Sequence, residues 1–309
     1  MAVELDVGQA LLLGPGSRSG TGKAGTSAPG RLRRAYAGEG EAIVHTPERE
    51  LRILCDHDLL NLTWTRHAVG ERGAEPHIHK HHTDAFYVLR GKVTFVLGPE
   101  LERMVAPAGT VVLIPPGVVH GFDNDGPGET RFLNIHAPGG GFVKNLRDHA
   151  TTWDTHDPPA DGGRPASDAV VRRPGEGHTL ALGPNSLVFK AEVGDGDGTF
   201  YLGESTLAPG FPGPPPHRHD EHLDSFFVLE GTLTLQLGDD QVEASAGSYA
   251  VAPPGSVHTF SNPGEGTVRA LNIMAPGGFE QYLKEAAAAG TTDPAEPAKI
   301  ASRYDFKPA

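Results

Sequence analysis

One stretch of the sequence concentrates side chains that bind metal ions. His77 and His79 are separated by one residue, Asp84 follows a few residues later, and His120 comes shortly after a Pro-Pro-Gly turn. Alternate side chains of a β-strand point to the same face, so His77 and His79 can share one ion. Three neutral imidazoles and one carboxylate suit Fe, Mn, Co, Ni or Cu, and also accept Zn. The pattern predicts one divalent transition metal on these four residues.

The same arrangement occurs again 140 residues later, counted from His77 to His217. The metal-binding residue types of this second copy are at His217, His219, Asp224 and His258. A lone His-x-His pair is usually a solvated or core pair. A duplicated pair, followed each time by an acid and a distant His at matched spacing, indicates a metal site instead. The sequence therefore predicts up to one metal ion in each copy.

The remaining histidines lack this spacing. We expect His81 to be a surface residue, and His136, which replaces Met274 of the second copy, to touch substrate if it faces inward. Solvated or hydrogen-bonded structural roles are expected for His45, His57, His67, His149, His156 and His178.

Composition excludes several classes of function. The chain has 309 residues, and its 26 basic against 39 acidic residues give a formal charge of -13, which disfavours nucleic acid and anionic membranes as partners. Cys55 is the only cysteine, so neither an intrachain disulfide nor a thiolate cluster can form. The sequence has neither a signal-peptide pattern nor an apolar run long enough to span a membrane, which favours a cytoplasmic protein.

The elements that must position these side chains are short apolar segments separated by Gly, Pro, Asn and Asp. Segments 60–65, 86–89, 93–97 and 110–114 of the first half recur as 200–202, 226–229, 232–237 and 248–251 of the second. Many short strands with frequent turn residues are typical of a sandwich or barrel. Helical spacing follows in each half, over residues 142–148 and 279–289. We predict an all-β chain in which each of two barrels is followed by a short C-terminal helix.

The repeat also divides the chain into domains. The predicted parts are an N-terminal arm (1–34), a first barrel (35–150), a linker (151–172), a second barrel (173–290) and a C-terminal tail (291–309). The linker, above all residues 154–164, is rich in Pro, Asp and Gly, and we expect both it and the tail to be exposed. The apolar run that includes Leu11 is either an edge strand on one barrel or part of a disordered leader.

Both halves resemble the cupin superfamily, whose motifs are written G-x5-H-x-H-x3/4-E-x6-G and G-x5-P-x-G-x2-H-x3-N. The second motif matches in full, at residues 109–124 and 247–262. In the first motif the leading Gly falls one position early, at Gly70 and Gly210, which we attribute to a longer turn. The resemblance covers nearly all of residues 36–290 and implies a bicupin with two tandem jelly-roll β-barrels.

A second departure concerns the acid, because Asp84 and Asp224 stand where the family has Glu. Asp is one methylene shorter, so it either binds the metal with a closer backbone or stays beside the metal as a base. In the second case His82 and His222, at the same offset in both copies, become candidate ligands or partners of ligands.

Among bicupins the sequence looks most like the quercetinase-type dioxygenases, which implies a small-molecule substrate and O2 as partners. In such an enzyme the metal binds an enolic hydroxyl, and Asp84 or Asp224 would be the catalytic base that takes its proton. Two alternatives remain: a metal-dependent isomerase, cyclase or decarboxylase of a keto-enol substrate that does not use O2, and a non-enzymatic small-molecule-binding bicupin. The resemblance also allows homo-oligomers, or a pseudo-dimer of barrels within one chain.

Overall fold

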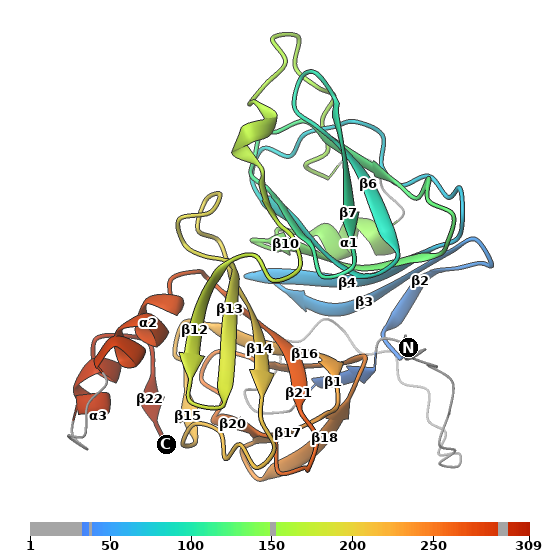
Figure 1. The fold of residues 1–309 in the computed structure, drawn as a ribbon. Helices are drawn as coiled ribbons and strands as arrows, with labels where there is room; N and C mark the ends of the chain where they lie inside the picture. Colours follow the sequence, from blue (N-terminus) through green and yellow to red (C-terminus); the bar gives the residue numbers. More distant parts are fainter. Residues whose placement is uncertain (1–32, 37–38, 149–152, 290–295) are drawn as a thin grey trace.

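The computed structural model describes residues 33–36, 39–148, 153–289 and 296–309, and its strands form two barrels (Figure 1). This confirms the predicted all-β class and the two tandem cupin barrels. Short apolar segments form the strands because alternate side chains can face the barrel interior while the others face the second barrel or solvent. The run at Leu11 and His149 lie outside the described residues.

The first barrel is built from a large and a small sheet that face each other. The large sheet has the order β11-β8-β5-β10-β4-β3-β2 and the small one β7-β6-β9. The strands are β2 (Glu41–His45), β3 (Arg49–His57), β4 (Leu60–His67), β5 (Thr83–Arg90), β6 (Lys92–Leu97), β7 (Glu102–Pro107), β8 (Val111–Ile114), β9 (His120–Asp123), β10 (Thr130–Ala137) and β11 (Val170–Arg172).

The second barrel repeats this plan. Its sheets have the orders β1-β19-β16-β21-β14-β13-β12 and β18-β17-β20-β15-β22. The strands are β1 (Arg33–Tyr36), β12 (His178–Leu182), β13 (Asn185–Ala191), β14 (Tyr201–Leu207), β15 (His217–Arg218), β16 (Leu223–Glu230), β17 (Thr232–Leu237), β18 (Asp240–Ser245), β19 (Ser248–Ala252), β20 (His258–Ser261), β21 (Val268–Ala275) and β22 (Lys307–Pro308).

The two barrels exchange their first strands. β1 precedes the first barrel in sequence but pairs with β19 of the second, while β11 precedes the second barrel but pairs with β8 of the first. One apolar core runs between the barrels and contains buried residues of both, such as Leu62 and Leu271. Tyr87 of the first barrel also donates a hydrogen bond to Glu204 of the second, with an O–O distance of 3.0 Å. The barrels therefore form one packed unit.

Short helices follow the barrels, as predicted. α1 (Phe142–Arg147) comes after β10, and α2 (Glu280–Ala289) comes after β21. A further helix, α3 (Glu296–Ala301), leads into the last strand. Among the described residues, none of these helices has the length and apolar character needed to cross a membrane.

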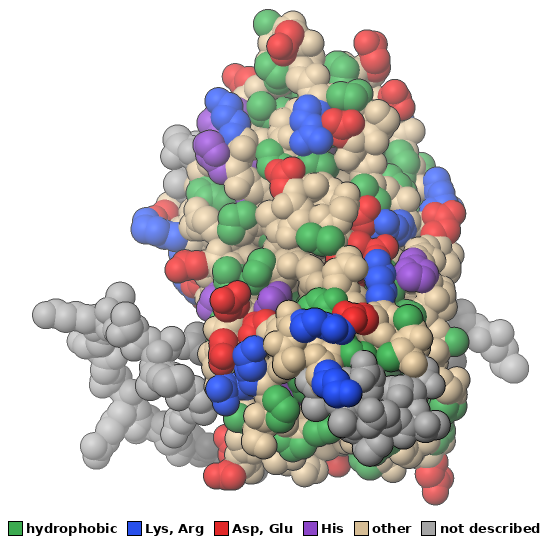
Figure 2. Space-filling model, turned by 90° about the vertical axis from the view of Figure 1, so that its left-hand side faces the viewer, with side chains coloured by type: hydrophobic (Ala, Val, Ile, Leu, Met, Phe, Trp, Pro, Cys, Tyr) green, Lys and Arg blue, Asp and Glu red, His purple; other side chains and the backbone are tan. Residues whose placement is uncertain are grey.

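Figure 2 shows one face of the molecule, on which acidic and basic side chains are interspersed and hydrophobic ones occur in small groups. On this face the described residues do not form the continuous basic stripe that nucleic-acid-binding proteins present.

Candidate metal centres

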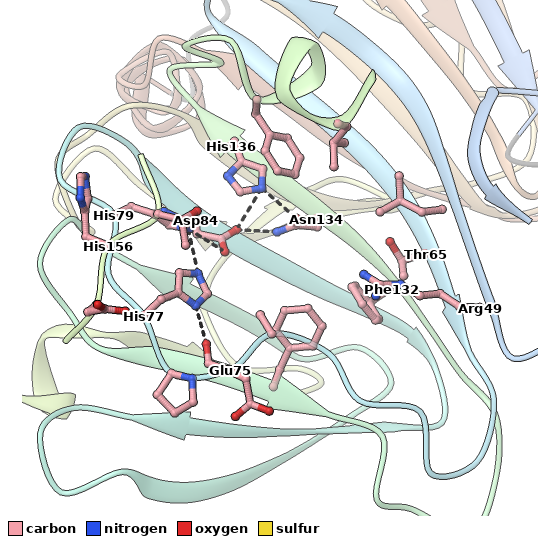
Figure 3. Close-up of a pocket in the computed structure, with 18 residues that line it drawn as sticks. Arg49, Thr65, Glu75, His77, His79, Asp84, Phe132, Asn134, His136 and His156 are labelled. Carbon is pink, nitrogen blue, oxygen red and sulfur yellow. Dashed lines mark hydrogen bonds and ion pairs between the residues drawn. The ribbon is translucent and has the colours of Figure 1, made fainter. Parts of the chain in front are cut away.

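The first barrel brings together the side chains that the sequence singled out. His77 and His79 lie just before β5, and His77 forms an isolated bridge with His120, the first residue of β9. The Nε2 atoms of His77 and His79 are 3.3 Å apart. The ligand nitrogens of the three histidines all lie within 4.8 Å of one another. Figure 3 shows His77 and His79 beside Asp84 at one end of a cavity.

Hydrogen bonds to the backbone leave the Nε2 atom of each of these three histidine rings available to a metal ion. The Nδ1 atoms of His77, His79 and His120 lie 2.7, 2.8 and 3.0 Å from backbone carbonyl oxygens, to which they donate. Burial, followed by the neighbouring His120, lowers the pKa of His77 to about 4, so its ring is neutral at pH 7. The Nε2 of His120 is buried and has no hydrogen-bond partner in the described chain. Bare, convergent Nε2 atoms with an Nδ1 held by a carbonyl fit a divalent metal ion.

Asp84, on β5, lies beside these nitrogens. Its Oδ2 is 3.4 Å from His120 Nε2 and 3.8 Å from His79 Nε2. Burial alone would raise the pKa of Asp84, but the His136, His120 and His79 rings outweigh it and hold this pKa well below its usual range. Asn134 donates a hydrogen bond to Oδ1. An ionised carboxylate therefore stands within reach of the three bare nitrogens.

The hydrogen bonds of Asn134 orient a further residue, His136. Both hydrogens of the Asn134 amide nitrogen are used, one by Asp84 and one by the Ala85 carbonyl at 3.3 Å. The amide oxygen must then accept, and it lies 2.8 Å from His136 Nε2, which carries the proton. The Nδ1 of His136 is consequently a bare acceptor, and it is buried without a partner in the described chain. His136 lines the cavity, as expected if it faces inward.

The second barrel contains an equivalent group. One ligand atom from each of its four members lies within 4.8 Å of the others: His217, His219, Asp224 and His258, all buried. Asp224 Oδ2 is 3.1 Å from His258 Nε2, and Asn272 donates to Oδ1 at 2.5 Å. Burial alone would raise the pKa of Asp224, but His258 outweighs it and lowers this pKa. The second group also has the composition of a metal site.

His82 and His222 lie next to the two metal groups, outside the sets of candidate ligands that contain Asp84 and Asp224. Their Nδ1 atoms lie 2.8 and 2.7 Å from the carboxylates of Asp154 and Asp305. The Nε2 of His82 is buried without a partner in the described chain, and His82 forms a second group of nitrogens with His79 and His136. The carboxylates of Asp84 and Asp224 lie 3.4 and 3.1 Å from the Nε2 atoms of His120 and His258, whereas neither His82 nor His222 belongs to the groups that contain those two histidines.

Asp154 and Asp305 are exceptions within segments that were expected to be exposed and in which many described residues are exposed. Asp154 lies in the predicted linker, and its carboxylate accepts the backbone amides of Lys80 and His81 at 3.1 and 2.9 Å. Asp305 lies in the predicted tail and accepts the equivalent amides in the second barrel. The carbonyls of both aspartates also accept from the second histidine of each His-x-His pair. Both segments are held in place because they accept hydrogen bonds from backbone amides and histidine rings at the metal groups.

The role of this pair was not predicted, although an aromatic residue precedes the aspartate each time in the sequence, in Trp153-Asp154 and Tyr304-Asp305. In the first barrel Trp153 packs on His82, with ring centroids 4.2 Å apart.

The two centres differ in access. A cavity of about 460 Å³ adjoins the first group and is lined by His77, His79, Asp84 and Thr155 among others. In the second barrel the residue after Asp305 is Phe306, whose ring stacks on His217 with centroids 4.3 Å apart. Thr155 holds the matching position after Asp154 and leaves this space open.

His67, at the end of β4, is neither solvated nor hydrogen-bonded, contrary to expectation. Its side chain is fully buried between Phe122 and Phe132, and both ring nitrogens lack partners in the described chain. Burial, together with Arg49 and Arg66, lowers the pKa of His67 to about 4. The second barrel has Leu207 at the end of the matching strand β14, so packing there does not require an imidazole.

This buried ring predicts a pH-dependent stability. Below pH 6.5 the unfolded chain binds a proton at His67 that the folded chain does not bind, so the free energy of unfolding falls between pH 6.5 and about 4. The loss from this group at pH 5 should be about 2 kcal/mol. In His67→Leu, the difference in unfolding free energy between pH 7.5 and pH 5, measured by urea denaturation, should shrink by that amount. His81→Leu, at an exposed position, serves as control, and an unchanged difference in His67→Leu would contradict the prediction.

Comparison with known proteins agrees with this architecture. Residues 64–136 and 203–274 each match the family described as "Cupin domain". Quercetin 2,3-dioxygenase of Bacillus subtilis is 24% identical over 256 residues, which cover 70% of this chain and 73% of that protein.

Solved structures share the fold at lower identity. A putative glyoxylate-induced protein from Pseudomonas aeruginosa superimposes with a TM-score of 0.59 at 18% identity, covering 82% of this chain and 93% of its own. Oxalate decarboxylase of Bacillus subtilis superimposes with a TM-score of 0.58 at 14% identity, covering 82% and 79%.

Proposed function

This chain is a bicupin of the cupin superfamily, and we propose that it is a metal-dependent dioxygenase whose first barrel acts on an enolic small molecule. One observation carries the proposal: in the first barrel, three bare imidazole nitrogens lie together beside an ionised carboxylate, and His77, His79 and Asp84 of this group line a cavity large enough for a substrate. The second barrel has the same group, but Phe306 covers it. The similarity to a quercetin dioxygenase supports the choice of reaction.

His77, His79, His120 and Asp84 would hold the metal in the first barrel, and His217, His219, His258 and Asp224 in the second. A divalent Fe, Mn, Co, Ni or Cu ion supplies, when bound, Lewis acidity toward a substrate oxygen and the redox chemistry that O2 requires.

Asp84 is the proposed catalytic base. Its pKa is held low, so at pH 7 it can accept the proton of a substrate hydroxyl that lies beside the histidines. Asn134 fixes the carboxylate through Oδ1 and leaves Oδ2 on the side of His79 and His120. The Asn134 hydrogen bond therefore orients the base without blocking the oxygen that would take the proton.

The cavity walls are suited to excluding water. Phe122, Phe132 and Phe142 line the cavity, and the Phe142 ring packs on His136 with centroids 3.7 Å apart. An apolar wall around the substrate protects a carbanion-like enolate from protonation by solvent and strengthens the electrostatic interactions inside the cavity.

Oxygen uptake is the direct test. The protein is reconstituted separately with Fe(II), Mn(II), Co(II), Ni(II) and Cu(II) and challenged with flavonols and other enolic aromatic compounds. Uptake that needs both metal and substrate supports the dioxygenase. Oxalate decarboxylase, one of the structural neighbours, represents the alternative. Release of CO2 from an acid substrate without net O2 uptake would replace the dioxygenase with a metal-dependent decarboxylase.

Asp84→Asn should lower turnover by about 100-fold, because the amide cannot accept the substrate proton in the same way. Elemental analysis should show that both metals remain, since the three histidines of each group are intact. Asp224→Asn, the matched change in the covered barrel, should leave turnover within about twofold. Equal losses in the two variants would contradict the assignment of chemistry to the first barrel.

A further inference from the structure

We propose that the substrate of the first barrel carries a carboxylate. The carboxylate binds Arg49, while the enolic oxygen of the same substrate faces the histidines of the metal group. This inference rests on the proposed function and narrows its substrate class to enolic or diphenolic acids.

Arg49 lies at the far end of the cavity from the metal-binding group. It is the first residue of β3 and lies opposite His67 in β4. It lines the cavity together with Thr65 and Phe132, and Figure 3 shows these three side chains on the side away from His77. The two ends of one cavity therefore present different chemistry to a ligand.

The Arg49 guanidinium lacks a counter-ion within the described chain. Its Nε is buried with no hydrogen-bond partner, and the side chain enters no ion pair there. The adjacent Glu50 points to the opposite face of the strand, where it accepts from Arg52 Nε at 2.5 Å and lies 3.6 Å from Arg66 Nε. A guanidinium stays protonated, so a partly buried one loses hydration of its positive charge. Without a neighbouring acid, this cost is poorly compensated.

Packing of the barrel does not require this charge. In the second barrel the matching position is Asn185, two residues before the buried Leu187, as Arg49 stands two residues before Leu51. Asn185 accepts the backbone amide of Ala208 at 2.8 Å, a local structural role. The guanidinium occurs only in the barrel whose metal group adjoins the large cavity, which points to a ligand rather than to the fold.

Charge along the cavity would orient such a ligand. Asp84 and Glu75 line the cavity near His77, whereas Arg49 lies at the other end. A carboxylate can form two parallel hydrogen bonds with the guanidinium at the second end, which leaves the enolic oxygen of the same ligand at the first end with the histidines. Phe122 and Phe132 lie among the cavity walls and suit an apolar, planar body between the two polar groups.

The test measures binding without turnover. Protein reconstituted with redox-inert Zn(II) is titrated calorimetrically with caffeate, a diphenol with a carboxylate, and with its neutral methyl ester. Native protein should bind the acid at least about 10-fold more tightly than the ester, as expected for a charge-assisted hydrogen bond. Arg49→Gln should bring the two affinities within about twofold of each other by weakening the acid alone, and Arg49→Lys should keep part of the preference.

Arg66→Gln is the matched control, because the Arg66 guanidinium donates to the carbonyls of Pro47 and Thr46 and does not line the cavity. It should retain the native preference, and thermal melts should confirm that all variants are folded. A preference for the acid that survives in Arg49→Gln, or equal affinities in native protein, would overturn this inference alone. Binding of both compounds that persists after removal of the metal would instead count against the proposed function.

Discussion

His120→Ala should abolish metal-dependent oxygen uptake, by on the order of 10³-fold or more, while His258→Ala leaves it within about twofold. His120 supplies a buried Nε2 that has no hydrogen-bond partner in the described chain, so its removal takes away one of the three imidazoles of the metal group in the first barrel. His258 is its counterpart in the covered centre. The two variants are chemically matched and differ only in which barrel they affect.

Metal analysis makes this comparison decisive. If native protein binds two ions, each variant should bind one, so loss of metal alone cannot explain a difference in turnover. Elemental analysis and oxygen uptake are therefore measured on the same samples. Loss of uptake in His258→Ala with retention in His120→Ala would place the chemistry in the second barrel.

The clustering of the site residues could be predicted from the sequence because residues two apart in extended backbone point the same way, although His77 and His79 lie outside the named strands and His77 pairs with His120 only in an isolated bridge. His77 and His79 are two residues apart, and their Nε2 atoms approach to 3.3 Å. The repeat showed that His120 belongs with them, since the same distant His recurs at His258. The all-β class and the short helices followed from equally local patterns.

Features that depend on long-range contacts could not be predicted in this way. Asp154 lies in a segment whose composition indicates an exposed linker, and only the fold shows that two backbone amides and the His82 ring donate to its carboxylate. Arg49 appears in the sequence as one of several charged residues in a strand. Its proposed role rests on a buried Nε that has no hydrogen-bond partner in the described chain, and residue spacing does not reveal such a feature.

The residue after the aspartate is Thr155 in the first barrel and Phe306 in the second, and this difference predicts which metal group a substrate can reach. Thr155→Phe should lower turnover by about 100-fold or more while both metal groups stay intact. In the second barrel the aromatic ring at this position stacks on the first histidine of the group, so a Phe at residue 155 should cover His77 in the same way. Thr155→Val, which has nearly the volume of Thr, should leave turnover within a few-fold.

The reciprocal change, Phe306→Thr, should open the second centre. With Cu(II) bound, azide should add a ligand-to-metal absorption band for one copper ion in native protein and for two in the variant. Removing this ring should cost about 3 kcal/mol of stability, because Phe306 also stacks on Tyr282. Full turnover in Thr155→Phe, or a second azide-accessible copper already present in native protein, would show that the aromatic ring does not decide access. If both changes behave as expected, the side chain that follows the aspartate, Thr155 or Phe306, determines whether the metal group beside it is open to substrate or covered.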